Sequence, residues 1–326
     1  MTNDGVAIGI IGAGIMGERL LGAILQQDSA LVHACGIWDP SPDAMRRMER
    51  NFPRVPRMHD AAAVIAASDC VYVASPPASH LGHARAALAA GKSFFGEKPL
   101  SVDVADARAF VAEAGSRGAV NFPFASSFAV AAIRDWIDKG EIGTPRRIDI
   151  EVGFKAWPRP WQADAVGWLD KPAQGGFTRE VVSHFLFLAR RLGGSLQGLN
   201  GEAWFPEPGT SERRIAGTLR AGDLPVTLSG AVGGTAKDDH NVWMLEGDRG
   251  AVRLCDWSIA ERRLPDGSWQ PAPDAMPNER ARPLALKRQL EGVVRLARGE
   301  AHHLATLGEA LNVQEIVEGI LAARST

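Results

Sequence analysis

Residues 6–17 read VAIGIIGAGIMG, a short apolar run that leads directly into three glycines. An apolar run of this length that stops at glycine is typical of a strand buried on both faces of a parallel sheet. The residues after Gly17 have helical character to about Gln27, and Leu31–Trp38 has the composition of a second strand. Strand, glycine turn, helix and strand in this order predict a βαβ unit.

The same alternation continues toward residue 120. Helices are predicted at Asp43–Asn51 and His80–Ala90, and strands at Cys70–Ala74 and Ser93–Gly96. Strands that alternate with helices imply a parallel sheet covered on both faces. We therefore predict a Rossmann domain over residues 1–121.

Residues 122–326 follow a different rhythm. Strands without intervening helices are expected at Ile148–Phe154, Pro225–Val232, Asn241–Glu246 and Ala251–Trp257. Such strands predict a large, mostly antiparallel sheet with one open face. The proline-rich stretch Pro265–Pro283 is expected to be a loop, and Leu307–Arg324 a helix. We predict an α+β domain for substrate binding and oligomerisation, whose terminal helix can return to the first domain.

Composition and charge argue against several classes of protein. A chain of 326 residues is long enough for about two domains. Its 36 basic and 38 acidic residues form no basic stripe, which argues against a nucleic-acid binder. No apolar run reaches the roughly 18 residues of a membrane span, and Met1–Asp4 is unlike a signal peptide. Cys35, Cys70 and Cys255 are too scattered for a disulfide framework or a metal site, which favours a cytoplasmic protein.

The three glycines have the spacing Gly-x-Gly-x-x-Gly of a dinucleotide-binding loop. Gly12 permits the tight turn, Gly14 lets a pyrophosphate approach the backbone, and Gly17 lets the helix pack on the strand. The N–H groups around Ile15 and Met16 then face the phosphates at the positive end of the helix dipole. The alternative is a glycine turn that holds no ligand.

Asp39 closes the second strand, 22 residues after Gly17. A carboxylate at this position accepts hydrogen bonds from the adenosine ribose and repels a 2′-phosphate. The expected cofactor is therefore NAD. NADP is possible if Arg46 or Arg47 neutralises its additional phosphate.

A second motif, Glu97-Lys98-Pro99, follows the predicted strand Ser93–Gly96. Ligands of parallel sheets bind at this carboxyl edge. A lysine beside a cationic nicotinamide would have a lowered pKa and could exchange a proton with a substrate hydroxyl. Glu97 is assigned to the cofactor site. The alternative is an ordinary Glu–Lys pair at a strand end.

The third motif begins at Gly175-Gly176 and ends at His184. Glu180 and His184 are four residues apart, so they share one face of a helix and could orient and charge a substrate hydroxyl. An ordinary helix contact is the alternative. Arg179 could bind an acidic substrate or form a plain ion pair.

Three tryptophans, Trp157, Trp161 and Trp168, precede this motif in a segment with few regular elements. An indole can stack on the apolar face of a sugar or on an aromatic substrate. The same residues could equally lie in the core or at a subunit interface.

These motifs, in this order, resemble the Gfo/Idh/MocA family, which includes glucose–fructose oxidoreductase and the inositol dehydrogenases. The resemblance rests on Gly12–Gly17, Ser75-Pro76-Pro77-Ala78-Ser79-His80, Glu97-Lys98-Pro99-Leu100, Gly175-Gly176, His184 and Glu246-Gly247-Asp248-Arg249-Gly250. It implies that Lys98 transfers the proton, that His184 is the catalytic histidine, and that Glu180 stands where aspartate is usual. It also implies that Ser75, Pro76 and His80 flank the cofactor.

The resemblance further implies an NAD(P)-dependent enzyme that moves a hydride to or from a secondary alcohol or ketone of a sugar, polyol or cyclic diol. It implies a homodimer or homotetramer formed through the C-terminal sheet. Phe177 and Phe187 depart from the family pattern, and a pocket that carries them is expected to offer a sugar fewer hydroxyl partners. The alternative function is a dinucleotide-binding sensor or scaffold that has lost turnover.

Overall fold

The computed structural model describes residues 5–325, and the side chains of residues 163–165 and 325 lie outside the described part, as does Met1–Asp4. The chain forms two compact units. The first holds Met1–Ser126 and Pro283–Leu311, and the second holds Ser127–Arg282 and Asn312–Thr326. The chain therefore leaves the first unit at residue 126 rather than 121, and it returns there within the predicted second domain. Residues 283–311 return to the first unit because Leu290 and Val293 pack in its hydrophobic core.

The first unit contains a six-stranded sheet with the order β14-β5-β4-β3-β1-β2. Its strands are β1 (Val6–Ile11), β2 (Val32–Trp38), β3 (Cys70–Val73), β4 (Ser93–Gly96), β5 (Gly118–Val120) and β14 (Ala305–Thr306). All neighbours are parallel except β14 and β5. Every residue of β3 and β4 is buried, so both faces of the sheet are covered. The predicted Rossmann sheet is confirmed.

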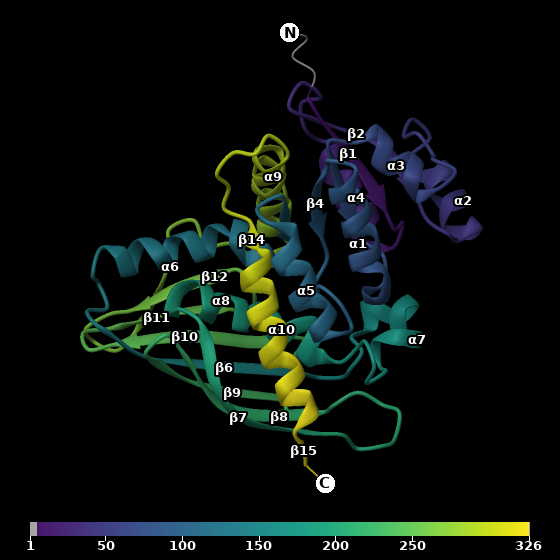
Figure 1. The fold of residues 1–326 in the computed structure, drawn as a ribbon. Coiled ribbons are helices and arrows are strands. Elements are labelled where there is room, and N and C mark those ends of the chain that lie inside the picture. The colour runs from purple at the N-terminus through teal and green to yellow at the C-terminus, as the bar shows by residue number, and fades with distance from the viewer. Residues whose placement is uncertain (1–4, 326) are drawn as a thin grey trace. The chain divides into compact units, whose positions relative to one another are not determined.

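Helices connect these strands. They are α1 (Ile15–Ile24), α2 (Pro42–Asn51), α3 (Ala61–Ala67), α4 (His80–Ala89) and α5 (Val104–Ala114). Three of them, α1, α2 and α4, lie where the sequence pattern predicted helices. Figure 1 shows α1, α3 and α4 beside the strands that they connect. Because each helix follows a strand, the carboxyl ends of the strands and the helix N-termini lie along one edge of the sheet.

The prediction of a loop over Pro265–Pro283 is wrong in part. The structure places a strand, β13 (Trp269–Pro271), within it, and α9 (Asn278–Ala297) begins before it ends. Pro283 lies inside α9, where it removes one helical hydrogen bond. The buried apolar residues of this helix begin only at Leu290, so its first turns carry no periodic signal.

The second unit contains a nine-stranded sheet with the order β13-β12-β11-β10-β6-β9-β8-β7-β15. Its strands besides β13 are β6 (Pro145–Phe154), β7 (Leu196–Trp204), β8 (Arg214–Ala221), β9 (Leu224–Val232), β10 (His240–Gly247), β11 (Ala251–Cys255), β12 (Ile259–Arg263) and β15 (Arg324–Ser325). Only β6 with β9 and β7 with β15 are parallel. The predicted large, mostly antiparallel sheet is confirmed.

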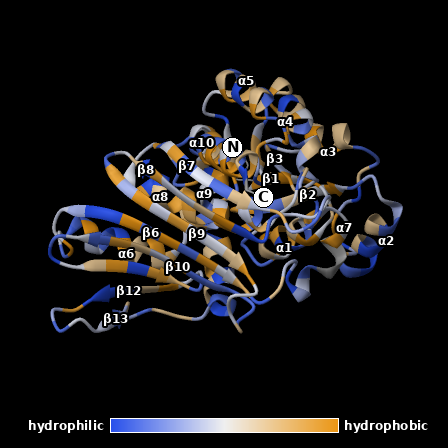
Figure 2. Ribbon diagram, turned by 90° about the horizontal axis from the view of Figure 1, so that it is seen from below, coloured by the Kyte–Doolittle hydropathy of each residue, from blue (hydrophilic) through white to orange (hydrophobic). Residues whose placement is uncertain are grey.

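One face of this sheet carries helices and the other is open. Figure 1 shows α6 (Phe128–Asp138) and α8 (Ser183–Gly193) on the same side of the strands. Buried and exposed residues alternate along β8 and β9, and Figure 2 shows hydrophobic and hydrophilic residues in turn along β6 and β9. Such alternation is typical of a sheet with one face packed and one face exposed.

The segment between β6 and β7 contains most of the irregular structure. It includes a 3₁₀ segment (Pro160–Ala165), the short helix α7 (Val166–Leu169) and a π-helical turn (Thr178–Val182) that runs directly into α8. The last helix of the chain is α10 (Leu307–Ala322). A π-helical turn is rare and is frequently found at functional sites.

Gly17 and Gly22 lie in the same helix and provide a matched pair of substitutions. A methyl group on Gly17 would lie 2.0 Å from the carbonyl oxygen of Gly12, whereas one on Gly22 would meet nothing within 4 Å. Gly17→Ala should therefore destabilise the protein by about 1–3 kcal/mol or more. Gly22→Ala should stabilise it by about 0.5–1 kcal/mol, because alanine is the better helix former. Urea unfolding of both variants tests this, and equal effects would contradict the close approach at Gly17.

Candidate active site

Two glycines of the loop, Gly12 and Gly14, differ in whether packing within the protein requires them. Gly12 has φ +105° and its absent side chain would clash with Ala74, so this position needs glycine for the turn. A Cβ on Gly14, by contrast, would meet no atom within 4 Å. Gly14 also begins α1 without a side-chain cap. The loop therefore has room for a ligand group against the backbone and N–H groups suited to phosphate, as a bound pyrophosphate requires.

Asp39 is fixed beside this loop by two backbone donors. Its Oδ2 accepts the N–H of Ala13 at 2.8 Å, and its Oδ1 accepts the N–H of Ser41 at 2.8 Å. The side chain remains half-buried, so it is not sealed from solvent. A carboxylate oxygen can accept more than one hydrogen bond, so Asp39 keeps acceptor capacity for the hydroxyls of a ribose.

His80 connects the two loops that follow β3 and β4. Its Nδ1 lies 2.7 Å from the carbonyl oxygen of Pro99, and its Nε2 lies 2.7 Å from that of Ser75. The ring is 1% exposed. Burial lowers the pKa of His80, although the two carbonyl acceptors favour the charged form. The structure thus places His80 between the carbonyl groups of Ser75 and Pro99.

Glu97 is held by a buried polar network below the strand end. Its Oε1 accepts hydrogen bonds from the Tyr72 hydroxyl and from Asn121 Nδ2, the latter at 2.6 Å. Gln289 Nε2 in turn donates to Asn121 Oδ1 at 2.6 Å. Burial, together with the neighbouring Glu97 carboxylate, raises the pKa of Tyr72, which keeps its hydroxyl a donor. The network fixes the peptide that leads into Lys98, whose side chain is half-buried.

Glu180 and His184 lie in consecutive helical segments of the second unit. Glu180 lies in the π-helical turn and is half-buried, and His184 lies in α8 and is 8% exposed. The imidazole packs edge-on against the indole of Trp257, with ring centroids 5.5 Å apart. Trp257 and the preceding Asp256 have φ values of +75° and +43°, which side-chain-bearing residues rarely adopt. Backbone strain of this kind concentrates at functional sites.

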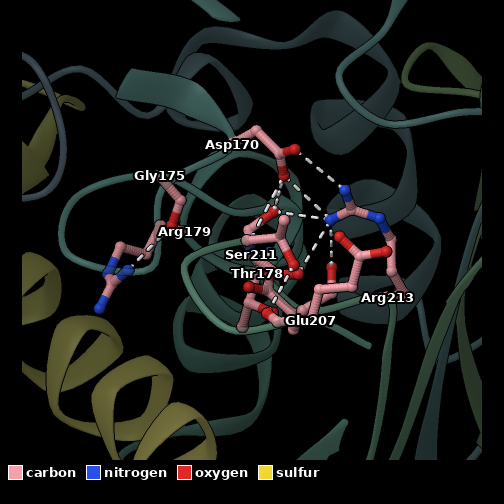
Figure 3. Close-up of polar contacts among 9 residues, drawn as sticks. Asp170, Gly175, Thr178, Arg179, Glu207, Ser211 and Arg213 are labelled. Carbon is pink, nitrogen blue, oxygen red and sulfur yellow. Dashed lines mark hydrogen bonds and ion pairs between the residues drawn. The ribbon is translucent and has the colours of Figure 1, made fainter. Parts of the chain in front are cut away.

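Arg179 is engaged within the second unit at every guanidinium nitrogen. Its Nε and Nη2 donate to the two carboxylate oxygens of Glu318, both at 2.6 Å. Its Nη1 donates to the carbonyl oxygens of Pro172 and Gly175, both at 2.8 Å, and Figure 3 shows the contact with Gly175. Arg179 therefore forms an ion pair, which was the alternative to substrate binding, and its partner Glu318 is 139 residues away. We therefore do not include Arg179 in the proposed substrate site.

A second ion-pair network fixes the start of the same segment. Asp170 accepts hydrogen bonds from the Ser211 hydroxyl at 2.5 Å and from Arg213 Nη2 at 3.0 Å (Figure 3). Hydrogen bonds and charge from Arg213 outweigh burial and lower the pKa of Asp170, so it stays ionised. Because Ser211 and Arg213 lie between β7 and β8, this network attaches the segment to the large sheet.

Glu212 provides a third attachment, directly at the π-helical turn. This carboxylate is fully buried, and its Oε1 accepts the N–H of Thr178 at 2.7 Å. Burial raises its pKa. A Cβ at Gly176, where φ is +102°, would lie 2.3 Å from Glu212 Oε2. Glycine at this position is therefore required by the buried carboxylate.

The three tryptophans have different environments. Trp157 is 7% exposed and packs against Phe154 and Phe177, so it belongs to the core. Trp161 is 50% exposed, with the Arg159 guanidinium 4.8 Å from its ring centre. Trp168, on α7, is 36% exposed. Only the last two present an open indole surface for a ligand.

The expectation about Phe177 and Phe187 is wrong. Both side chains are 0% exposed, and Phe177 packs between Phe154 and Trp157. Phe187 lies in α8, which is buried along most of its length. These phenylalanines fill the core, so they give no reason to disfavour a sugar.

Several residues that support the candidate site carry no local signal in the sequence. Glu212, Glu318 and Trp257 contact Thr178, Arg179 and His184 from other parts of the chain. Asn121 bonds Glu97, and Gln289 in turn bonds Asn121. Among residues 5–325, no group of three His, Cys, Asp or Glu side chains could hold a metal ion. No described helix is long and apolar enough to cross a membrane.

Replacing Arg179 separates its bracing role from a role in substrate binding. Arg179→Ala leaves the Glu318 carboxylate and two carbonyl oxygens without their donor, which should cost about 3–5 kcal/mol of stability. Arg220→Ala is the matched control, because its ion pair with Asp223 is exposed and should be worth less than about 1 kcal/mol. Urea unfolding measures both. Unchanged stability of Arg179→Ala with a raised KM would instead favour the substrate role.

The lowered pKa of His80 predicts a pH-dependent contribution to stability. Below pH 6.5, the ring's ordinary pKa, the unfolded chain binds a proton more readily than the folded protein does. The contribution of His80 is therefore complete above pH 6.5 and is lost as the pH falls toward the lowered folded value. His80→Gln should cost about 1–3 kcal/mol at pH 8, and this deficit should shrink toward pH 5.

Urea unfolding of wild type and variant across this range measures the deficit. His59→Gln, at an exposed histidine, is the control and should change stability by less than about 0.5 kcal/mol. A deficit for His80→Gln that grew as the pH fell would show that the buried ring is charged in the folded protein.

Comparison with known proteins yields relatives by sequence and by structure. Residues 6–123 match the family described as "Oxidoreductase family, NAD-binding Rossmann fold" (GFO_IDH_MocA). A dTDP-3,4-didehydro-2,6-dideoxy-alpha-D-glucose 3-reductase of Streptomyces violaceoruber is 35% identical over 130 residues, which are 39% of this chain and 36% of that protein. A 1,5-anhydro-D-fructose reductase of Ensifer adhaerens is 36% identical over 121 residues, which are 36% of this chain and 35% of that protein. The matches thus span about a third of these curated relatives.

The shared fold extends over nearly the whole chain. The solved structure of levoglucosan dehydrogenase in complex with NADH has a TM-score of 0.84 and 16% sequence identity, and the match covers 98% of this chain and 96% of that one. At this identity the likeness shows the fold alone. The family match rests on the unit that contains the glycine loop, Asp39 and Lys98. Residues 6–123 are thus similar to the Gfo/Idh/MocA oxidoreductase family, which is described as an NAD-binding Rossmann fold.

Proposed function

We propose that this protein is an NAD-dependent dehydrogenase or reductase that acts on a secondary alcohol or ketone of a sugar, polyol or cyclic diol. The observation that carries the proposal is the position of Lys98. It follows β4 at the carboxyl edge of the sheet whose first strand ends in the glycine loop. The Glu97 network and the His80 contact with Pro99 hold the residues before and after Lys98. The two curated relatives support a sugar, because their names describe sugar reductases.

The proposed cofactor site uses residues of the first unit. The open backbone at Gly14, with the N–H groups of Ile15 and Met16, binds the pyrophosphate, and Asp39 binds the ribose hydroxyls. When bound, the nicotinamide supplies the site that accepts or donates a hydride. The loop at Ser75-Pro76 flanks it, and His80 positions that loop through the Ser75 carbonyl.

The proposed chemistry of the protein itself is proton transfer and orientation. Lys98 Nζ takes the proton from the substrate hydroxyl during oxidation and returns it to the carbonyl oxygen during reduction. In the second unit, His184 and Glu180 are proposed to hold and polarise a substrate hydroxyl. Trp257 keeps the His184 ring in one orientation by edge-on packing. Trp161 and Trp168 provide aromatic surface for the apolar face of the substrate.

We also propose a homodimer or homotetramer formed through the open face of the nine-stranded sheet. Exposed side chains on this face include Thr218, Thr227 and Ser229, which can hydrogen-bond across an interface. The cysteines at 35, 70 and 255 are free thiols. Free thiols support a reducing, cytoplasmic setting.

Lys98→Met tests the proton-transfer role. Because the glycine loop and Asp39 hold the cofactor, NAD affinity should remain within about threefold of wild type, while kcat falls about 10²–10⁴-fold, as general acid–base catalysis predicts. His184→Ala should also lower kcat if the imidazole polarises the substrate hydroxyl. Turnover of a panel of sugars, polyols and dihydrodiols, followed by reduced-nicotinamide absorbance, provides the measurement.

Lys139→Met is the control, because Lys139 is an exposed lysine paired with Asp135 on α6. It should leave kcat unchanged. Near-normal turnover of Lys98→Met per NAD-binding site would overturn the proton-transfer role. Tight NAD binding by wild type without turnover of any alcohol or ketone would favour a sensor or scaffold.

A further inference from the structure

An arginine on α2 points back to the glycine loop. Arg47 Nη2 donates to the carbonyl oxygen of Ala13, and its Nε donates to Glu18 Oε1, both at 2.5 Å. The N–H of the same Ala13 is the group that donates to Asp39. The cationic side chain and the carboxylate proposed to bind the ribose therefore contact the carbonyl group and the N–H of the same residue, Ala13.

Glu18 keeps this arginine in place. Glu18 lies in the first turn of α1, where its own N–H bonds the carbonyl oxygen of Gly14, so its position is fixed relative to the loop. The side chains of Arg47 and Glu18 are 41% and 27% exposed, so the pair is neither sealed in the core nor fully solvated. Arg46, the neighbouring arginine, bonds Asp43 on its own helix instead.

We propose that Glu18 is a second determinant of cofactor choice, because it holds and neutralises Arg47, the cation that a 2′-phosphate at this site would need. The inference rests on the proposed function, in which NAD occupies the glycine loop. Asp39 disfavours NADP by repulsion, and Glu18 disfavours it by keeping the guanidinium engaged. Selectivity for NAD then has two parts. Asp39 repels the 2′-phosphate, and Glu18 keeps Arg47 from binding it.

The contacts predict how the two parts combine. Replacing Asp39 removes the repulsion and also frees the N–H groups of Ala13 and Ser41 as donors. Arg47 nevertheless stays paired with Glu18 in that variant. Replacing Glu18 as well releases a planar guanidinium that can bind phosphate with two parallel hydrogen bonds.

The experiment is a set of substitutions in the full-length chain, with the Kd for NAD⁺ and for NADP⁺ measured by calorimetry. Asp39→Ser should strengthen NADP⁺ binding about tenfold, and adding Glu18→Gln should strengthen it about tenfold more, as one charge-assisted hydrogen bond predicts. NAD⁺ affinity should change less than about threefold on addition of Glu18→Gln, because NAD⁺ has no 2′-phosphate. The additional gain for NADP⁺ should decrease as salt is raised.

Arg47 is tested by repeating Glu18→Gln in an Arg47→Gln background. If Glu18 acts through Arg47, the gain for NADP⁺ should disappear there. Arg47→Lys keeps the charge without the planar fork and should retain only part of the gain. Glu49→Gln removes the same charge from α2 at a residue paired with Arg57, and it should not change the preference.

Two results would overturn the proposal. One is a double variant that binds NADP⁺ no more tightly than Asp39→Ser. The other is an undiminished gain from Glu18→Gln in the Arg47→Gln background, because Glu18 would then act by its own charge. Failure of the proposed function gives a different result, since wild type would bind neither NAD⁺ nor NADP⁺. Thermal unfolding of each variant shows whether a loss of binding reflects a loss of fold.

Discussion

The candidate cofactor site depends on the approach of one helix backbone to one carbonyl oxygen. At Gly17 the space for a side chain is occupied by the carbonyl oxygen of Gly12, 2.0 Å from where a Cβ would lie. This approach sets where α1 begins relative to the end of β1. The peptide of Ala13 then lies where its N–H reaches Asp39 and its carbonyl oxygen reaches Arg47. A longer separation between helix and strand would move this peptide away from both partners.

The segment that precedes His184 is fixed by a different means, namely buried charge. Glu212 is fully buried against Thr178, and Arg179 is 9% exposed against Glu318. Burying such groups is costly unless they are paired and hydrogen-bonded. These buried groups stabilise the π-helical turn. A π-helical turn is intrinsically less stable than an α-helix and needs outside contacts to persist. The carboxylate and the guanidinium supply those contacts at adjacent residues.

The parts of the structure that were predictable from sequence are those whose signals are local. Three such signals lie within a few residues of a strand end. They are the glycine spacing after β1, Asp39 after β2 and the Glu-Lys-Pro motif after β4. The long-range contacts of these networks were not predictable, because Gln289 bonds Asn121 from 168 residues away and Glu318 bonds Arg179 from 139 residues away. Tryptophan burial was not predictable either, since an indole pattern alone does not distinguish core residues from exposed ones.

Two carboxylates of this chain show why similar contacts lead to different roles. Asp39 and Glu212 each accept a backbone N–H from a glycine-containing turn, at 2.8 and 2.7 Å. Asp39 is half-buried, so its remaining acceptor capacity can meet a ligand. Glu212 is sealed from solvent and burial raises its pKa, so a ligand cannot reach its oxygens. Exposure, rather than the bond itself, separates a residue that can recognise a cofactor from one that holds the backbone. By the same criterion the partly exposed Arg47, and not the buried Arg179, is the arginine able to change partners when a charged ligand arrives.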